Sequence, residues 1–345
     1  MPQSSIREVA RRAGVSVGTV SNVLNRPDLV AEATRDRVRT AIEELGFVRN
    51  ESARRLRQGP ETGSGKGPDA GAEPGRPRVF GVLVEDLANP YATDVARGAE
   101  LALNEAGYEA LWLTNDHSPD KERRALELLV RQRATGALVI PVALDPAGLD
   151  RLRAAGLSVV LLDRAAATAC SAQVDHVAGG EIAAAHLTGL GRDRTAFVTG
   201  RPEPAPIGQR RDGFRRALLE GGRPEPVLLA QAALTPTEGR AAAHRLLEKD
   251  PLPGAVFCAN DLLAIGLVNE LIRLGVRVPA DIAVVGYDDI ELAGSAAVPL
   301  TTIRQPRREL GWEAAELALA EVVEGDAHLH RQVVLRPELV VRESA

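Results

Sequence analysis

Apolar residues recur at helical spacing in three short segments within the first 47 residues. We expect helices over about residues 6–12, over the stretch VSVGTVSNVLN that begins at Val15, and over about residues 32–45. Ser16 is placed to cap the second helix, and Gly14 and Gly46 follow the first and third as residues that end helices. Two short helices joined by a Gly-containing turn, with a third packed behind them, predict a helix-turn-helix unit over residues 1–47.

The second helix carries an outward face without charge or long side chains. Its apolar positions, Val20, Val23 and Leu24, share one side, and hydroxyl and amide groups fill the other. Such short groups are mediocre helix formers, but they would let the backbone approach phosphates and base edges closely if the helix lies in the major groove. We therefore predict DNA contacts from seven residues: Ser16, Val17, Gly18, Thr19, Ser21, Asn22 and Asn25.

The alternative is a polar helix that faces only solvent. Arginines on the flanking helices favour DNA, because they stand where contacts to the phosphate backbone are needed: Arg7, Arg11, Arg12, Arg35, Arg37 and Arg39. Within the outward face, Thr19, Ser21 and Asn25 can donate to phosphates. Asn22 can pair with adenine, and Val17 can touch a thymine methyl group.

A basic segment follows, FVRNESARRLRQG, which begins at Phe47. Asn50 is placed to cap a short helix over residues 48–58, in which Leu56 stands among three arginines. Leu56 has no apolar neighbour at helical spacing and so has no core to join. An isolated apolar side chain flanked by cations is what a minor-groove wedge requires, although a frayed linker with stray arginines would have the same composition.

Residues 59–77 are rich in Gly and Pro and hold no apolar anchor, which predicts a flexible linker. The piece GSGK within it invites comparison with a phosphate-binding loop, but the pattern fails. Pro60 stands where the first Gly of that motif belongs, Gly67 replaces its Ser or Thr, and no strand precedes it.

From residue 78 onward, short apolar runs alternate with helical stretches of a dozen or more residues. The runs are VFGVLV, ALWLT, ALVI, SVVLLD, TAFVTG, VLLA, AVFCA and IAVVGYD. They predict parallel sheets covered by helices, divided between two α/β lobes over residues 78–345. The tail, VVLRPELVVRESA, is expected to return as a strand pair, and the absence of a heptad repeat after it favours a dimer.

Polar residues break the apolar runs at the carboxyl ends of the predicted strands, where sheets of this type bind ligands. They are Asp86, Asn89, Asp163, Arg164, Asp175, Asn260, Asp261, Asp288 and Asp289. Any one of them could simply cap the following helix. Their recurrence favours a polar cleft, and Arg among Asp and Asn side chains suits a hydroxylated ligand, because each can make paired hydrogen bonds with vicinal hydroxyls.

Charge is distributed unevenly along the chain. The 345 residues include 42 Lys or Arg and 47 Asp or Glu, for a formal net charge of −5. Residues 1–58 hold 11 Arg and 7 acidic residues, a net of +4, so the remainder carries −9. A small basic head on a large acidic body is expected when only the head meets phosphates.

The two cysteines, Cys170 and Cys258, lie far apart in the sequence and belong to no CxxC pair. This fits a reducing compartment and argues against a disulfide framework or a zinc site. No apolar run approaches the roughly 20 residues that cross a bilayer, and the N-terminus lacks the apolar core of a secretory signal. We therefore expect a cytoplasmic protein without membrane contact.

These motifs resemble the LacI/GalR family of bacterial transcription regulators. IREVARRAGVSVGTVSNVLN, the GF after the third helix and NESARRLRQG match its DNA-binding head almost step for step, and the similarity continues along nearly the whole chain apart from the linker. The resemblance implies a homodimer on a pseudo-palindromic operator of double-stranded DNA. It also implies paired hinge helices in the minor groove, with Leu56 as the wedge and Ala53 beside it. Arg49 departs from the family, which usually has Pro before the capping Asn.

The resemblance further implies that the two lobes form one effector-binding and dimerisation domain like the periplasmic binding proteins, with a small-molecule effector between the lobes. NPY, LLDR, GQRRDGF, ANDLLAIG, VVGYDD and PLTTIRQ match motifs around that site, and give six effector-binding residues: Tyr91, Asp163, Arg210, Asn260, Asp288 and Gln305. Leu234 sits where many sugar-binding members have a stacking aromatic, and Ala92 where Phe is frequent. These departures predict a roomier pocket or another ligand, so that a sugar or related polyol is a hypothesis.

The predicted function is therefore a ligand-responsive DNA-binding regulator, a repressor that needs no cofactor. A solute-binding transport protein would share the two-lobed body but would lack the basic head. An enzyme is disfavoured, because there is no GxGxxG after the first strand and no GxSxG elbow. His328 and His330 are close in sequence, but no third metal ligand is evident near them, and we expect neither catalytic residues nor a metal site.

Overall fold

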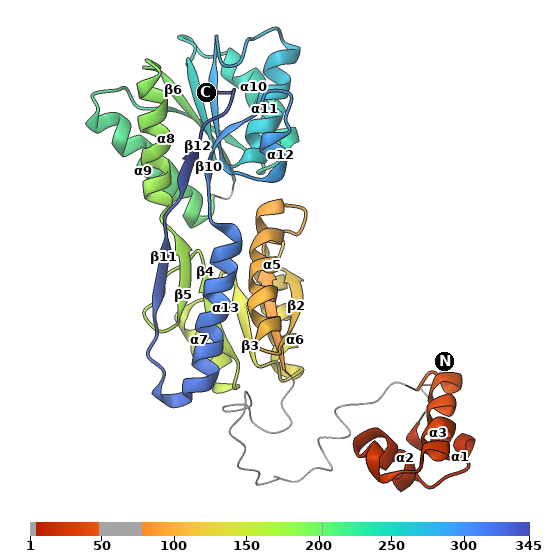
Figure 1. Ribbon diagram of the computed structural model, residues 1–345. Coiled ribbons are helices and arrows are strands. Elements are labelled where there is room, and N and C mark those ends of the chain that lie inside the picture. The colour runs from red at the N-terminus through yellow and green to blue at the C-terminus, as the bar shows by residue number, and fades with distance from the viewer. Residues whose placement is uncertain (1–4, 48–77, 202) are drawn as a thin grey trace. The chain divides into compact units, whose positions relative to one another are not determined.

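The computed structural model describes residues 5–47, 78–201 and 203–345, which belong to a helical head and an α/β body (Figure 1). The predicted hinge helix over residues 48–58, with Asn50, Ala53 and Leu56, and the predicted linker over residues 59–77 lie outside the described residues. Within the described ranges, no helix combines the length and the apolar character that crossing a bilayer requires.

The head has its helices where the apolar spacing predicts them: α1 (Ile6–Ala13), α2 (Val17–Asn25), the 3-10 turn η1 (Pro27–Leu29) and α3 (Glu32–Leu45). Ser5 and Glu8 cap α1 reciprocally, since the Glu8 N–H donates to Ser5 Oγ at 3.3 Å and the Ser5 N–H donates to the Glu8 carboxylate at 2.6 Å. Gly14 and Gly46 end α1 and α3 in the left-handed conformation, with φ of 66° and 56°.

One valine from each helix forms the centre of the head core. Val9, Val20 and Val38 are fully buried, and smaller or half-buried apolar side chains surround them. The predicted apolar faces therefore meet each other, as a helix-turn-helix unit requires.

The body contains two six-stranded sheets, one in each of two lobes (Figure 1). The first lobe has the strand order β11-β5-β4-β3-β1-β2, and all its pairs are parallel. Its strands are β1 (Val79–Val84), β2 (Glu109–Thr114), β3 (Gly136–Val139), β4 (Ser158–Leu162), β5 (Ser171–Val174) and β11 (Gln332–Leu335).

The second lobe has the order β12-β10-β9-β8-β6-β7, parallel except that β12 runs antiparallel to β10. Its strands are β6 (Thr195–Gly200), β7 (Val227–Gln231), β8 (Ala255–Cys258), β9 (Ala283–Asp288), β10 (Thr301–Arg304) and β12 (Glu338–Val340). The predicted class, a helical head followed by two parallel α/β lobes, is confirmed.

Helices cover the two faces of the first sheet and share a core with each. One face packs against α5 (Pro90–Glu105) and α13 (Arg307–Glu324), and the other against α6 (Pro119–Arg131) and α7 (Pro146–Ala154). A short 3-10 turn, η2 (Gly325–Ala327), follows α13.

The second lobe has one continuous core, built from β6, β8 and β9 and the helices around them. Its helices pack as two pairs, α8 (His176–Gly189) with α9 (Ala205–Glu220) and α10 (Pro236–Leu247) with α11 (Asp261–Arg273) (Figure 1). The short helix α12 (Glu291–Gly294) follows β9.

The chain passes between the lobes three times: after β5, after β10 and after β11. The predicted tail strand pair is therefore wrong. β11 lies beside β5 in the first lobe and β12 beside β10 in the second, because the chain runs on through Arg336 and Pro337 instead of turning back. The apolar runs also missed β5 and β10, whose sequences SAQV and TTIR are largely polar.

Reciprocal glycines let the paired helices approach each other. Between α8 and α9, a Cβ added to Gly213 would lie 2.1 Å from the carbonyl oxygen of Val177, and one added to Gly180 would lie 2.1 Å from that of Arg210. Such separations are far inside van der Waals contact, so any side chain would force these helices apart. The other two pairs repeat the arrangement, with Gly98 and Gly311 between α5 and α13, and Gly239 and Gly266 between α10 and α11.

We expect Gly213→Ala to destabilise the body by roughly 1–3 kcal/mol, the usual cost of overpacking, because its methyl group must push α9 away from α8. Gly189→Ala is the matched control. Gly189 lies at the end of α8, the partner helix of α9, and a Cβ added there would have no atom within 4 Å. Because Ala has a higher helix propensity than Gly, this variant should be as stable as wild type or slightly more stable. Urea unfolding of both variants measures the difference, and equal losses would contradict the proposed cause.

Candidate nucleic-acid interface and candidate effector site

The uncharged face of α2 lies on the surface of the head. Ser16, Gly18 and Asn22 are exposed, whereas Val20 and Val23 on the opposite side are 0% and 8% exposed. Burial of the two valines holds the helix on the head and fixes which side chains point outward. The face predicted to meet DNA is therefore accessible and is not part of the core.

The remaining predicted contacts of α2 lie at the edge of this face. Val17, Thr19 and Ser21 are half-buried. Ser16 caps the helix, since its Oγ accepts the Thr19 N–H at 3.0 Å and lies 2.9 Å from Thr19 Oγ1. This places the helix N-terminus, with its partial positive charge, next to the outward face. Asn25 is the last residue of α2, and its side chain lies outside the described part of the structure.

Arginines of α1 and α3 add positive charge to the surface of the head. Arg12 forms an ion pair with Glu44 at 2.5 Å, and both side chains stay near half exposure. Arg35 is half-buried and donates to the carbonyl oxygen of Pro27 at 3.5 Å. The other four are exposed: Arg7, Arg11, Arg37 and Arg39. Exposed guanidinium groups of this kind suit contacts to phosphates.

In the body, five of the six predicted effector residues line one cavity: Tyr91, Asp163, Arg210, Asn260 and Asp288. Tyr91 and Asp163 come from the first lobe and the other three from the second, at the carboxyl ends of the strands. The cavity has a volume of about 40 Å³, little more than one water molecule occupies in the liquid.

Of the two predicted alternatives, a roomier pocket or another ligand, the small cavity of this structure does not favour the first, because the polar side chains around it bond to one another. Another ligand stays a prediction. Leu234 does line the cavity, at the place where the family often has an aromatic. Ala92, in contrast, is 1% exposed and belongs to the core beneath α5, so its small size does not enlarge the cavity.

Asp163 follows β4 with a φ of 52°, in the left-handed region that Asp adopts more readily than most residues with a side chain. Its carboxylate accepts a hydrogen bond from the Tyr91 hydroxyl and lies 3.3 Å from Nε2 of His176. Burial raises the pKa of this carboxyl, but the bonds from His176 and Tyr91 outweigh it, so the pKa is lowered and the group is ionised. Burial, followed by the charge of Asp163, raises the pKa of Tyr91 well above its usual range, so Tyr91 stays a donor.

His176 joins the two lobes and was missed by the sequence analysis. It is 1% exposed, and its Nδ1 accepts the Nε–H of Arg210 at 3.3 Å and lies 3.0 Å from the Tyr287 hydroxyl. This arrangement leaves the proton on Nε2, where it is donated to Asp163. Burial, helped by the charge of Arg210, lowers the pKa of His176, so the ring is neutral. Its position directly after the strand-end residue Asp175 is the signal that could have found it.

Arg210 is held in place by three further contacts. Its guanidinium carbon lies 3.8 Å from the centre of the Tyr287 ring, and its Nη1 donates to the carbonyl oxygen of Ala259 at 2.7 Å and lies 3.9 Å from the Asp288 carboxylate. Stacking on an aromatic face and a nearby carboxylate offset the cost of burying this charge. Glu85, a half-buried carboxyl that also lines the cavity, was likewise missed.

Asp288 is the second carboxylate of the cavity and, like Asp163, has a positive φ, here 114°. It is 3% exposed, and burial raises its pKa to about 6 despite the opposing charges of Arg210 and Arg307. Gln305 donates to its Oδ1 at 2.6 Å. Gln305 does not line the cavity but stands behind Asp288 and orients it.

For most other strand-end residues, the alternative of a structural role is correct. Asp175 caps α8, Asp86 accepts the N–H of Ala88, Asp261 accepts bonds from Thr302 and Ile290, and Asp289 pairs with Arg304 and Arg342. Asn89 caps α5 and also lines the cavity. Asn260 has both roles, because it caps α11, donates to the Leu234 carbonyl oxygen at 3.3 Å and lines the cavity. Arg164 is exposed.

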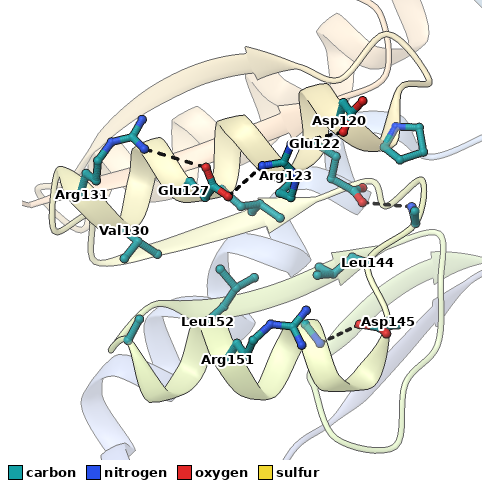
Figure 2. A pocket seen from close by; sticks show the side chains of 15 residues that line it. Asp120, Glu122, Arg123, Glu127, Val130, Arg131, Leu144, Asp145, Arg151 and Leu152 are labelled. Atoms are coloured by element: carbon teal, nitrogen blue, oxygen red, sulfur yellow. Dashed lines mark hydrogen bonds and ion pairs between the residues drawn. The ribbon is translucent and has the colours of Figure 1, made fainter.

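A larger groove of about 600 Å³ lies between α6 and α7 in the first lobe (Figure 2). Leu126, Val130, Leu144 and Leu152 make it apolar, and along its edge Glu127 pairs with Arg123 and Arg131. It contains none of the predicted effector residues. The polar cavity between the lobes is therefore the candidate effector site.

Comparison with known protein families supports the assignment of both the helical head and the α/β body. Residues 5–50 match the family described as bacterial regulatory proteins, lacI family, and residues 184–345 match the periplasmic binding protein-like domain. The HTH-type transcriptional repressor PurR of Photobacterium profundum is 32% identical over 345 residues, which cover 99% of this chain and 98% of that protein.

Two solved structures are similar along the whole chain. The transcriptional regulator CelR–cellobiose complex is 30% identical, with a TM-score of 0.71 and coverage of 99% of this chain and 100% of that one. The lac repressor dimer bound to operator and the anti-inducer ONPF is 26% identical, with a TM-score of 0.74 and coverage of 99% of both chains. The resemblance seen in the sequence motifs is confirmed. From its exposed α2 face, its two-lobed body and its similarity to repressors over the full length, we conclude that this chain belongs to the lacI family of bacterial DNA-binding transcription regulators.

Proposed function

We propose that the protein is a homodimeric cytoplasmic repressor whose affinity for its operator is controlled by a small polar effector bound between the lobes. The observation that best supports it is the uncharged surface of α2, where Ser16, Gly18 and Asn22 are exposed and two buried valines fix their direction. A pseudo-palindromic operator has two half-sites, and two heads related by two-fold symmetry would read them.

In this proposal the head makes two kinds of contact. Asn22, Val17 and Gly18 face base edges in the major groove, and Thr19, Ser21 and Asn25 donate to phosphates together with the arginines of α1 and α3. The hinge residues Asn50, Ala53 and Leu56 add a minor-groove contact, with Leu56 as a wedge between base steps.

The cavity chemistry supports a hydroxylated effector, a sugar or related polyol. Asp163 and Asp288 can accept hydrogen bonds from hydroxyl groups, and Arg210 and Asn260 can donate to their oxygens. The CelR structure with cellobiose supports a carbohydrate. Leu234 provides an apolar wall in place of a stacking aromatic, which favours a ligand held mainly by hydrogen bonds.

The small cavity supports a mechanism of coupling. With about 40 Å³ available, an effector must displace side chains or part the lobes, and either change breaks the bridge from Asp163 through His176 to Arg210. A ligand that replaces these bonds would favour a different relation of the lobes and so weaken operator binding. Coupling of this kind is typically about 1–3 kcal/mol.

We expect Asn22→Ala to weaken operator binding by about 1–3 kcal/mol, roughly 5- to 150-fold, because a paired amide contact to one base is lost. Fluorescence anisotropy with the genomic fragment that the wild-type protein selects, and with random duplex, measures both affinities. Thr40→Ala, an exposed change on α3 of the same head, is the control and should alter neither. Equal losses on operator and random DNA would contradict base readout by α2.

Arg210→Lys should abolish the response to effector while the variant still binds operator, because Lys lacks the planar fork that pairs with vicinal oxygens. Titration of pentoses, disaccharides and purine bases against the protein–operator complex identifies the responding ligand. Arg211→Lys is the matched control, since Arg211 pairs with Glu203 and Asp212 and does not line the cavity. A variant at position 210 with an unchanged response would place the effector elsewhere.

The pKa of Asp288 predicts how the stability of the body depends on pH. The pKa of this carboxyl rises from 3.8 to about 6 on folding, so the folded state binds the proton more tightly. The resulting stabilisation is complete below about pH 4 and is lost as pH rises through 6, a change of up to about 3 kcal/mol. Asp288→Asn has no carboxyl group to titrate at this position. As pH is raised from 4 to 7, the free energy of unfolding of the variant, measured in urea, should therefore rise by this amount relative to that of wild type. A difference that is constant with pH would refute the raised pKa.

A further inference from the structure

A second polar cluster lies at the amino edge of the first-lobe sheet, at the opposite end of the strands from the effector site. Cys170 precedes β5, Glu321 is in the last turn of α13, and His328 and His330 lie in the connection between η2 and β11. One donor atom from each of the four residues lies within 4.8 Å of the others. We propose that these four residues bind one divalent transition-metal ion of the zinc type.

The distances are close to those of a tetrahedral site. Cys170 Sγ lies 3.0 Å from Nε2 of His328 and 3.9 Å from Nδ1 of His330. Bonds of about 2.0–2.3 Å to a tetrahedral ion place neighbouring ligands about 3.3–3.8 Å apart. Small rotations of these side chains would therefore bring a set of one sulfur, two nitrogens and one oxygen to bonding distance.

The groups around the donors already orient them. Nδ1 of His328 lies 2.7 Å from the Glu324 carboxylate, so this nitrogen carries the proton and Nε2 turns its lone pair toward Cys170. In zinc sites, a carboxylate commonly accepts the proton of the outer nitrogen of a ligating histidine and so fixes the ring's orientation. The backbone N–H of Arg331 donates to Cys170 Sγ at 3.3 Å, which would stabilise a thiolate.

Glu321 is half-buried and directs one carboxylate oxygen into the protein. Its Oε2 is buried and has no hydrogen-bond partner among the described residues. An unpaired buried carboxylate oxygen costs several kcal/mol, and coordination to a metal ion removes that cost. Cys170 is fully buried and the His328 side chain is 2% exposed, whereas His330 is exposed and leaves a path for the ion.

The charges balance when the ion binds. Zn²⁺ with a thiolate from Cys170, a carboxylate from Glu321 and two neutral imidazoles is a neutral assembly, which a partly buried position favours. Burial raises the pKa of the Cys170 thiol, so the metal displaces a proton that leaves to solvent. Burial also lowers the pKa of His330, which keeps its ring neutral.

Binding of a metal ion at this cluster requires the hydrogen bond between Arg153 and His330 to break. Arg153 Nη2 lies 3.2 Å from Nε2 of His330 and also donates to the Thr168 carbonyl oxygen. In that arrangement the proton of His330 is on Nδ1, the nitrogen that faces Cys170. Metal binding at Nδ1 moves the proton to Nε2, so Arg153 gives up this bond and keeps Thr168. Thiolate with imidazole selects Zn²⁺ over Mg²⁺ or Ca²⁺, which prefer oxygen ligands.

Three of the four residues, Glu321, His328 and His330, lie within ten positions of one another, and only the thiol comes from a distant segment. No third ligand is evident beside His328 and His330 in the sequence, whereas the structure brings Cys170, 158 positions before His328, next to them. With four protein ligands the proposed site is closed. It would therefore clamp α13, β5 and the connection to β11 together, as structural zinc sites do.

Titration of the untagged, chelator-treated full chain with Co²⁺ tests the proposal. We expect one Co²⁺ per chain, with the intense visible bands of tetrahedral cobalt and a near-ultraviolet thiolate-to-cobalt band, and Zn²⁺ should displace it. Cys170→Ser should lose the thiolate band. Glu324→Gln should keep the bands but weaken binding about 10- to 100-fold, the usual effect of removing the carboxylate that orients a ligating histidine.

Two variants make the test specific. His244 is the matched control, because its Nε2 lies 2.7 Å from the Glu270 carboxylate in the second lobe, so His244→Gln should bind Co²⁺ like wild type. His330→Gln changes an exposed residue, so this variant should fold. It should bind Co²⁺ more weakly than wild type, and it provides the test if the buried substitution Cys170→Ser prevents folding. Absence of stoichiometric binding, a spectrum without a thiolate band, or equal binding by wild type and His330→Gln would overturn the proposal.

Discussion

The body depends on helices that touch backbone to backbone. Gly180 and Gly213 bring α8 and α9 so close that each glycine meets a carbonyl oxygen of the other helix. α8 begins with His176 and α9 carries Arg210, so this contact is what allows their side chains to meet at 3.3 Å. A bulkier residue at either glycine would separate the helices and disconnect the effector site.

The two opposite edges of the first-lobe sheet carry different sets of polar side chains. Its strands end at one edge, where Asp163 and Tyr91 meet the second lobe, and its covering helix α13 ends at the other, where Glu321 meets Cys170. Because helices and strands run in opposite directions in such a layer, the two ends of one lobe collect different side chains. At the strand-end edge, the Arg210 guanidinium stacks on Tyr287 and lies 3.9 Å from the Asp288 carboxylate, and both contacts offset the cost of burying its charge.

The sequence predicted the head helices because their causes are local. Caps such as Ser16 act over three residues, and apolar spacing acts over a few turns, so both can be seen in one short stretch. The apolar strands were predictable for the same reason. β5 and β10 were not, because their polar residues become strands by pairing with neighbours that the sequence does not specify. The tail failed similarly, since nothing local distinguishes a turn at Pro337 from a crossing between lobes.

By itself, the sequence determined the helical head, the outward face of α2, the parallel α/β body and a set of polar residues at strand ends. Only the tertiary structure decided which of those residues form a site. Asp288 and Asp289 are adjacent in the chain, yet one lines the cavity and the other pairs with Arg304 and Arg342. The reason is that burial and bonding partners depend on the position of segments far away in the chain, as the meeting of Cys170 with His328 also shows.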